Sequence, residues 1–487
     1  MYSLCSRLVT GILYRSGSHS GFTSRSADMS EHRYPLGHVL YRKLNKRFPL
    51  ITRGEGCWLV DEEGKRYLDA CGGAFVANLG HGVAEIGQAM AEQAGRLAYV
   101  NGTAFTHEPV EQLATEVAAL SPGDLNEVYP LCSGSEAVEA AFKFARQYWV
   151  ETGKAKKHKI VALTPAYHGN TLLALSASAR EHYKTYYREW LVDVARVPAP
   201  YTYRCECSGR PPLCPACDGS AVEEAIVRLG PETVAAFSAE PIGGSSSGAT
   251  VPPADYFRRI REICDRHQVL FVADEVLTGA GRTGTWAAIS HFGVVPDLMT
   301  LGKGLGGGYA PISALVAPGR LVDVLANGSG ALLHAQTYSH HPVLCAGALA
   351  AVRYVQRHKL IERCAAMGQV LHRKLQALRG LPSVGDVRGR GLLAGVEFVA
   401  DPETRAPFPR GRGFAERFTA LALEEGLVVW PNVGQADGTN GDLVMLAPPF
   451  TISEEEISEL VRRFSRALER AVAAGKAGAA EKAVEAV

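Results

Sequence analysis

The sequence lacks several features that mark whole classes of protein. Lys and Arg number 51 against 50 Asp and Glu, so the net charge of +1 gives no electrostatic case for nucleic acid or a membrane surface as a partner. No uninterrupted apolar run approaches the roughly 18 residues that a membrane-spanning helix needs. The 11 Cys are an odd number, which argues against a fully paired secreted framework. We therefore expect a reducing compartment and a cytoplasmic location.

The composition is otherwise that of an ordinary globular protein. The chain has 487 residues, 47% of them hydrophobic and 21% charged, which is enough for more than one core. Runs typical of strands alternate with runs typical of helices through the middle of the chain. This alternation predicts an α/β fold, and the length predicts two domains.

The first 28 residues differ from the rest of the chain. They carry Arg7, Arg15 and Arg25 and many Ser, and no acidic residue comes before Asp28. This composition resembles a mitochondrial transit segment, which would place the protein in mitochondria. The alternative is that Met29 is the true start and that residues 1–28 are not part of the working protein.

One lysine stands in an unusual setting. The apolar run Leu298–Leu301 leads to Lys303, and four of the five residues that follow Lys303 are Gly. Glycine allows a bulky group to approach the backbone closely. A lysine with apolar residues behind it can have a lowered pKa and act as a nucleophile. Taken alone, the stretch is equally consistent with a glycine turn and a solvated lysine.

Polar side chains follow four further apolar runs that read as strands. Ser133 and Ser135 open a long amphipathic segment, where they can cap a helix whose first N–H groups form an anion site. Tyr167, Glu240 and Asp274 each come at the end of a predicted strand. In open α/β sheets, ligands bind at the carboxyl ends of the strands. The alternatives are an ordinary capped helix and simple aromatic packing.

Four cysteines lie close together in the sequence, as a C-x-C pair and a C-x2-C pair: Cys205, Cys207, Cys214 and Cys217. Two such pairs can hold a tetrahedral zinc ion. However, the pairs are closer together than in usual zinc modules, and Pro211-Pro212 marks a loop. We therefore expect a surface loop with free or paired thiols and no metal, with a structural zinc site as the alternative.

These stretches, in this order from about residue 35 to 470, resemble the class III pyridoxal-phosphate aminotransferases. The resemblance implies fold type I: a large domain with a mostly parallel seven-stranded sheet, and a small α+β domain built from both chain ends. It implies residues 29–80 and 344–472 for the small domain and residues 81–343 for the large cofactor-binding domain. Residues 473–487 read as a flexible tail.

The resemblance also assigns roles around pyridoxal 5'-phosphate. Lys303 matches the lysine that forms the Schiff base with the cofactor and shuttles the proton. Asp274 matches the carboxylate that pairs with the pyridine nitrogen. Ser133, Gly134 and Ser135 match the loop that holds the phosphate.

Further positions match residues around the cofactor ring. Tyr167 matches the aromatic residue over the ring, and His168 and Gly169 complete its signature. Glu240 matches a glutamate that supports the site, and Val276 matches the residue against the opposite ring face.

Two more positions bear on the pocket and on assembly. Thr337 matches a threonine that reaches the phosphate of the neighbouring subunit, so the resemblance implies a homodimer or a dimer of dimers. Phe75 lies where amine-using members carry an aromatic pocket wall.

Three positions depart from the glutamate-linked branch of the family. Asn170 and Met445 stand where that branch has Arg, and Ser245 stands where it has an acidic residue. No Arg occurs between Arg417 and Arg462, so the usual C-terminal carboxylate anchor is absent. We therefore expect an amine or ω-amino acid as donor and pyruvate as the keto acid acceptor, in two half-reactions.

Three alternatives remain open. A diamine enzyme of the 7,8-diaminopelargonate type and a lyase or decarboxylase would use the same scaffold and the same lysine. A non-catalytic protein organised by the cysteine loop is the third.

Overall fold

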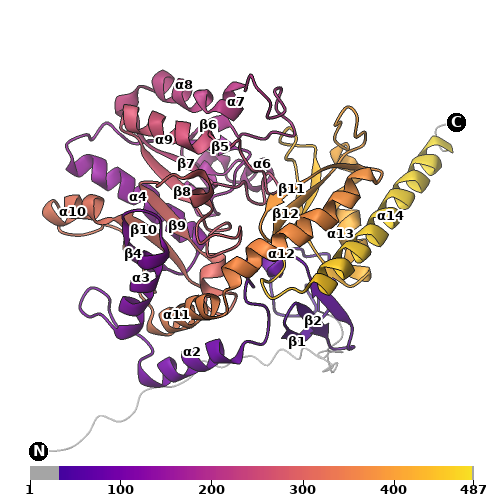
Figure 1. Ribbon diagram of the computed structural model, residues 1–487, viewed down its shortest axis with the longest axis horizontal. Coiled ribbons are helices and arrows are strands. Elements are labelled where there is room, and N and C mark those ends of the chain that lie inside the picture. Colours follow the sequence, from indigo (N-terminus) through magenta and orange to yellow (C-terminus); the bar gives the residue numbers. More distant parts are fainter. Residues whose placement is uncertain (1–31, 485–487) are drawn as a thin grey trace, which may run out of the picture.

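The computed structural model describes residues 32–484, with side chains to Gly475. Residues 1–28 and Met29 therefore lie outside the described part, and the alternatives for the start of the chain stay untested. Figure 1 shows the large domain beside the small domain, with helix α12 (Leu360–Leu375) between them. No described helix is long and apolar enough to cross a bilayer.

The large domain is built on one seven-stranded sheet. In spatial order its strands are β4 (Leu125–Leu131), β10 (Ser313–Pro318), β9 (Leu298–Leu301), β8 (Leu270–Asp274), β7 (Val234–Ala239), β5 (Lys159–Thr164) and β6 (Ala195–Pro198). Strand β10 is antiparallel to both its neighbours, and every other adjacent pair is parallel. The prediction of a mostly parallel seven-stranded sheet is confirmed.

Helices cover both faces of this sheet, as its nearly continuous apolar strands require. On one face, strand residues such as Phe237 and Phe271 share a core with four helices. These are α3 (Glu108–Leu120), α8 (Ser220–Leu229), α9 (Tyr256–His267) and α11 (Pro342–Arg357). On the other face, Val272 packs with α4 (Gly134–Glu151) and α10 (Gly319–Asn327), and α5 (Leu172–Ala177) with α4. Helix α2 (Ala84–Arg96) contacts α11 from outside.

The small domain is built from both ends of the described chain, as predicted. One four-stranded sheet pairs β1 (Ile51–Glu55), β2 (Trp58–Asp61) and β3 (Arg66–Asp69) with β13 (Leu427–Val428). A second contains β11 (Val384–Arg390), β12 (Leu393–Phe398), β15 (Asp442–Leu446) and β14 (Trp430–Val433). Helices α12, α13 (Phe414–Glu424) and α14 (Glu454–Val484) complete it. Leu68 shares its core with Leu371 and Phe464.

Local details differ from the sequence interpretation. The apolar run Leu427–Trp430 reads as one strand but contributes to two strands in different sheets, because β13 pairs with β3 and β14 pairs with β15. Helix α14 continues through residues 473–484, where a flexible tail was expected, and residues 485–487 lie outside the described part. Helix α11 contributes side chains to both domain cores, so the domain limits remain predictions.

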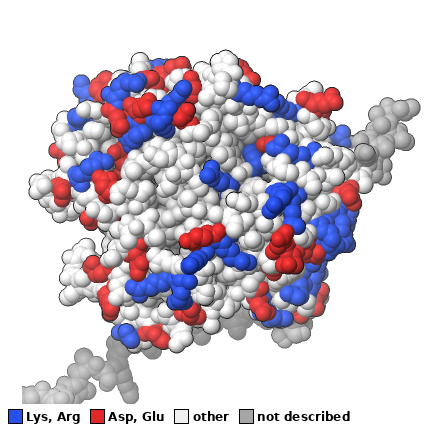
Figure 2. All heavy atoms as spheres, viewed as in Figure 1, with Lys and Arg blue, Asp and Glu red and all other residues white. Residues whose placement is uncertain are grey.

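Charge is mixed over the surface. Figure 2 shows basic and acidic side chains interspersed on one face, mostly toward its rim, around a central area with few charges. This distribution matches the near-zero net charge of the whole chain.

Candidate active site

The polar residues that follow the strands converge on one edge of the large sheet. Ser133, Tyr167, Glu240, Asp274 and Lys303 stand at or just after the carboxyl ends of β4, β5, β7, β8 and β9. Because these strands are parallel to one another, their carboxyl ends meet at the same edge. A cavity of about 570 Å³ opens there between the two domains.

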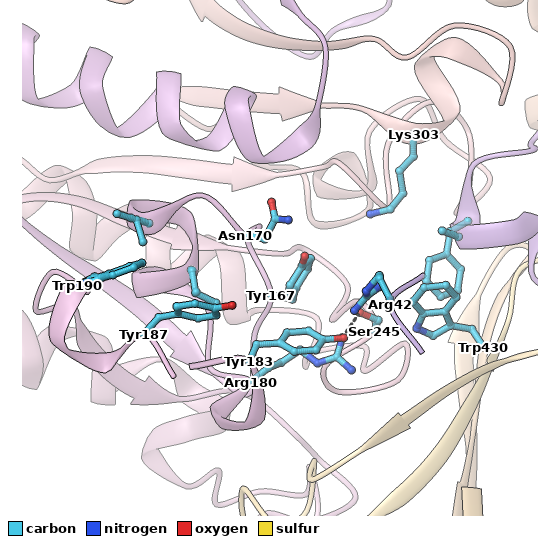
Figure 3. Close-up of a pocket in the computed structure, with 14 residues that line it drawn as sticks. Arg42, Tyr167, Asn170, Arg180, Tyr183, Tyr187, Trp190, Ser245, Lys303 and Trp430 are labelled. Atoms are coloured by element: carbon cyan, nitrogen blue, oxygen red, sulfur yellow. Dashed lines mark hydrogen bonds between the residues drawn. The ribbon is translucent and has the colours of Figure 1, made fainter. Parts of the chain in front are cut away.

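Lys303 reaches this cavity from the end of β9. Its backbone has φ 42°, a left-handed conformation that is rare for a side chain other than Gly. Figure 3 shows the amine pointing into the cavity. Burial lowers the pKa of Lys303, and the carboxylates of Asp274 and Glu240 oppose this shift. The amine is therefore closer to its neutral, nucleophilic form than an exposed lysine is.

Asp274 is a buried carboxylate with both oxygens occupied. Its Oδ2 lies 2.7 Å from His168 Nδ1, and its Oδ1 accepts from Thr300 Oγ1 at 3.2 Å and from the N–H of Val276 at 3.1 Å. The side chain is 4% exposed. These contacts hold the carboxylate in place, so Asp274 can stabilise a positive charge placed beside it.

The N-terminus of α4 faces the same edge. Ser133 caps this helix, and its Oγ accepts from the N–H of Glu136 at 3.3 Å. Ser135 Oγ accepts from the N–H of Asn170 at 3.1 Å and lies 3.0 Å from Asn170 Oδ1. A capped helix start with free N–H groups and two hydroxyls can hold a phosphate.

Two glycines leave the backbone around this helix start without side chains. A Cβ on Gly134 would overlap Val276, and Val276 thereby packs directly on the helix start. Gly169 has φ 139°, and a Cβ there would lie 2.9 Å from Ser135 Cα. Both positions need glycine because neighbouring chain segments approach too closely for any side chain.

Glu240 supports the segment that carries Tyr167. Its Oε2 accepts from the N–H of Tyr167 at 3.1 Å. Burial raises the pKa of Glu240 to about 7, against the opposing effect of His168. The carboxyl thus joins the ends of β7 and β5 beneath the cavity.

Three of the four predicted substrate-pocket residues line the cavity, and one does not. Phe75, Asn170 and Ser245 line the cavity. Met445 does not, which corrects the expectation of a pocket residue: it is fully buried in an apolar cluster with Phe75. Its side chain is covered because it packs in that cluster against apolar residues such as Leu393 and Leu443. The ring of Phe75 lies 5.3 Å from that of Trp430.

Thr337 lies outside this cavity. It is exposed, and its backbone carbonyl accepts from the hydroxyl of Tyr99 at 2.9 Å. Its predicted contact is with a neighbouring subunit, so it stays a prediction.

Arg180 is a cavity residue that sequence reasoning missed. It is 7% exposed, and Nη1 donates to Ser245 Oγ at 3.3 Å while Nη2 donates to Asn432. Its guanidinium lies 4.8 Å from the ring centre of Tyr183 and 5.7 Å from that of Tyr167 (Figure 3). Nε has no partner, and no Asp or Glu among residues 32–475 forms an ion pair with Arg180. A buried cation of this kind can receive a carboxylate from a ligand.

Among the other wall residues that the sequence did not reveal, one is a cation and four are aromatic: Arg42, Tyr183, Tyr187, Trp190 and Trp430. They come from the N-terminal segment, from the irregular region after α5 and from β14. No periodic pattern marks them, so the sequence carried no usable signal beyond a local abundance of Tyr and Trp.

The chain is similar to known proteins over most of its length. The model of the family described as Aminotransferase class-III matches residues 41–468. An uncharacterized aminotransferase of Bacillus subtilis, YodT, is 39% identical over 88% of this chain and 96% of its own length. The putrescine–pyruvate aminotransferase of Pseudomonas aeruginosa is 34% identical over 89% of this chain and 93% of its own length.

Solved structures agree. The omega transaminase of Pseudomonas jessenii, in complex with PMP, superposes with a TM-score of 0.82 at 32% identity, over 89% of this chain and 96% of that one. Lys303 and Asp274 at one edge of the sheet, the seven-stranded sheet itself and the match over most of the length lead to one conclusion. This chain belongs to the class III aminotransferases.

Proposed function

We propose that this enzyme binds pyridoxal 5'-phosphate and moves an amino group from an amine or ω-amino acid to pyruvate. The observation that carries the proposal is that a desolvated lysine amine, Lys303, stands at the same edge of the sheet as a buried, hydrogen-bonded carboxylate, Asp274. The relative from Pseudomonas aeruginosa, named for putrescine and pyruvate, supports a diamine donor and this acceptor.

The residues present fit the cofactor. The start of α4, kept free of side chains by Gly134 and Gly169, would hold the phosphate with Ser133 and Ser135. Asp274 would pair with the ring nitrogen, and Tyr167 and Val276 would contact the two ring faces, while Lys303 would meet the aldehyde. When bound, pyridoxal phosphate supplies an electron sink for a substrate carbon that loses its proton.

The protein's own groups then move the proton. Lys303 Nζ would take it from the substrate carbon as a general base and deliver it, as a general acid, to the carbon that was the cofactor's aldehyde. Positioned proton transfer of this kind contributes about 10²–10⁴-fold to a rate. Burial prepares Lys303 for this role because it lowers the pKa of the amine.

Asp274 has a complementary task. Held by His168, Thr300 and the N–H of Val276, it would pair with the ring nitrogen and stabilise a positive charge there. The second half-reaction uses the same residues in reverse order with the keto acid.

Arg180 explains how a carboxylate is held without the usual C-terminal arginine. Its guanidinium is buried in the wall and is not neutralised by an acidic partner among residues 32–475. We infer that it binds the carboxylate of pyruvate and of ω-amino acid donors. Ser245, which stands where the glutamate-linked branch has an acidic residue, hydrogen-bonds Arg180 and does not neutralise it.

We also propose a homodimer with Thr337 at the subunit boundary. Thr337 lies among large exposed apolar side chains: Tyr99 is 45% exposed, Phe105 67%, Leu333 67% and Tyr338 56%. Tyr99 packs edge-on against Tyr338. Apolar side chains gathered at a surface mark interaction sites. A molar mass of one chain in light scattering at micromolar concentration would contradict the proposal.

The function is tested by steady-state kinetics with a panel of amine and ω-amino acid donors. Each donor is paired with pyruvate and then with 2-oxoglutarate, and alanine or glutamate is quantified. We expect kcat/KM to be at least about tenfold higher with pyruvate, since 2-oxoglutarate brings a second carboxylate without a matching arginine. A clear preference for 2-oxoglutarate would overturn the proposed acceptor.

A further inference from the structure

A second cluster of reactive side chains lies outside the cavity, in the loop between β6 and α8. Its members are the four cysteines noted in the sequence: Cys205, Cys207, Cys214 and Cys217. Their sulfur atoms all lie within 4.8 Å of one another. Nothing in the proposed transamination uses these thiols.

The contacts among the sulfurs connect all four. Cys205 Sγ lies 3.5 Å from Cys207 Sγ and 3.3 Å from Cys217 Sγ, and Cys207 Sγ lies 3.3 Å from Cys214 Sγ. Two separate disulfide pairs would not require the contact between Cys205 and Cys207. Four thiolates around one zinc ion at about 2.3 Å stand about 3.8 Å apart in a tetrahedron. The cluster has nearly this size and connectivity.

We propose that Cys205, Cys207, Cys214 and Cys217 bind one structural zinc ion. All four ligands are thiolates, so a tetrahedral ion has no open position for a substrate or water, which is the arrangement of structural rather than catalytic zinc. Cys217 is fully buried in the short helix α7 (Pro215–Asp218), just before α8, and the other three are half-buried. The ion therefore joins a surface turn to the body of the large domain.

The same loop is fastened to the small domain. Arg204, next to Cys205, donates from Nε to Glu397 Oε1 at 2.7 Å, and the hydroxyl of Tyr201 donates to the other oxygen of this buried carboxylate. From the small domain, Arg405 Nη1 donates to the carbonyl of Tyr203 at 2.7 Å. Zinc would hold this bridging loop in shape and thus fix how the two domains enclose the cavity.

The spacing of the cysteines in the sequence conceals this arrangement. The six residues between Cys207 and Cys214 are fewer than in usual zinc modules, but Ser208 and Gly209 adopt left-handed φ values of 49° and 72°. This sharp turn brings the two pairs together in a short loop, which spacing alone did not reveal.

The test is the metal content of the purified full-length enzyme, measured by plasma mass spectrometry. We expect one zinc per chain, released in the same amount when a mercurial reagent blocks the thiols. The double variant Cys207→Ser/Cys214→Ser should contain none. The control Cys345→Ala, a buried cysteine of α11 outside the cluster, should keep its zinc.

Thiol titration of the wild-type enzyme distinguishes zinc binding from disulfide formation. It does not depend on how a variant folds. In denaturant with a chelator, zinc binding predicts that all 11 Cys react. Two disulfides within the cluster would leave only 7 of the 11 Cys free to react, and this result would overturn the proposal. Absence of stoichiometric zinc, or iron in its place, would overturn it as well. Transaminase activity is measured separately, so failure here does not bear on the proposed function.

Discussion

His168 Nδ1 lies 2.7 Å from Asp274 Oδ2, with the His168 side chain fully buried and that of Asp274 4% exposed. The two residues follow different strands, β5 and β8, so the contact joins two strand ends across the sheet. An ionised carboxylate accepts only, so His168 Nδ1 carries the hydrogen. The contact fixes the orientation of Asp274 before any ligand arrives.

Asp274→Asn should therefore damage catalysis far more than folding. The amide keeps the shape but loses the negative charge that holds a proton on the cofactor ring. We expect kcat to fall by at least about 100-fold while the melting temperature changes little. Asp265→Asn, in which an exposed carboxylate of α9 is changed, is the control and should leave kcat unaltered. Equal kcat values for Asp274→Asn and wild type would refute the role of this carboxylate.

Gly169→Ala should weaken cofactor binding. Its Cβ would lie 2.6 Å from Ser135 Oγ and would displace the loop that is proposed to hold the phosphate. Gly153→Ala is a matched control, because Gly153 also has a positive φ, 76°, but has open space around it. Both variants incur a backbone cost of about 1–2 kcal/mol. Only Gly169→Ala should raise the Kd for pyridoxal phosphate, by about tenfold or more, in a spectroscopic titration.

Arg180→Met should separate substrates by whether they carry a carboxylate. Loss of a charge-assisted hydrogen bond of about 1.5–3 kcal/mol predicts a rise in KM for pyruvate of about 10–100-fold. The half-reaction between the variant loaded with pyridoxal phosphate and an amine that lacks a carboxylate should keep its rate. Arg188→Met removes an exposed arginine outside the cavity wall and serves as the control. Loss of rate with both kinds of substrate would mean that Arg180 is only structural.

The buried carboxyl of Glu275 should make the stability of the cofactor-free protein depend on pH. It is fully buried, accepts from the N–H of Ile289 at 2.7 Å, and burial raises its pKa from 4.5 to about 7. Its folded-state pKa is above the unfolded value, so its contribution is fully present below about pH 4.5 and is lost as the pH rises through 7. Glu275→Gln should flatten the decline in melting temperature between these values. In the control variant Glu262→Gln, an exposed carboxyl is changed, and the melting temperature should decline as that of the wild type does.

Much of the site could be predicted because its residues stand at strand ends. Lys303, Asp274, Glu240, Tyr167 and Ser133 each follow a recognisable apolar run, and parallel pairing brings such ends together. The spacing of apolar residues and the polar residues that end each run are local features of the sequence. They therefore indicate these positions without knowledge of the fold.

The rest depended on tertiary contacts that no local pattern records. Arg180 and Trp430 enter the wall from an irregular segment and from a strand that changes sheets after Val428. Strand β11 was not predicted, because Gly385, Asp386 and Gly389 interrupt its apolar alternation. Met445 was placed in the pocket by analogy, and only its packing with Phe75 and Leu443 in the folded protein shows that it is covered.

The measurement that tests the account most directly is the stoichiometry of the complete reaction. Purified enzyme with pyridoxal phosphate, putrescine and pyruvate is sampled over time for alanine and for the carbonyl product, with Lys303→Ala as the blank. The account predicts that alanine and carbonyl product form in equal amounts, and that the Lys303→Ala enzyme forms neither. Carbonyl product or carbon dioxide without alanine, or undiminished turnover by Lys303→Ala, would contradict it.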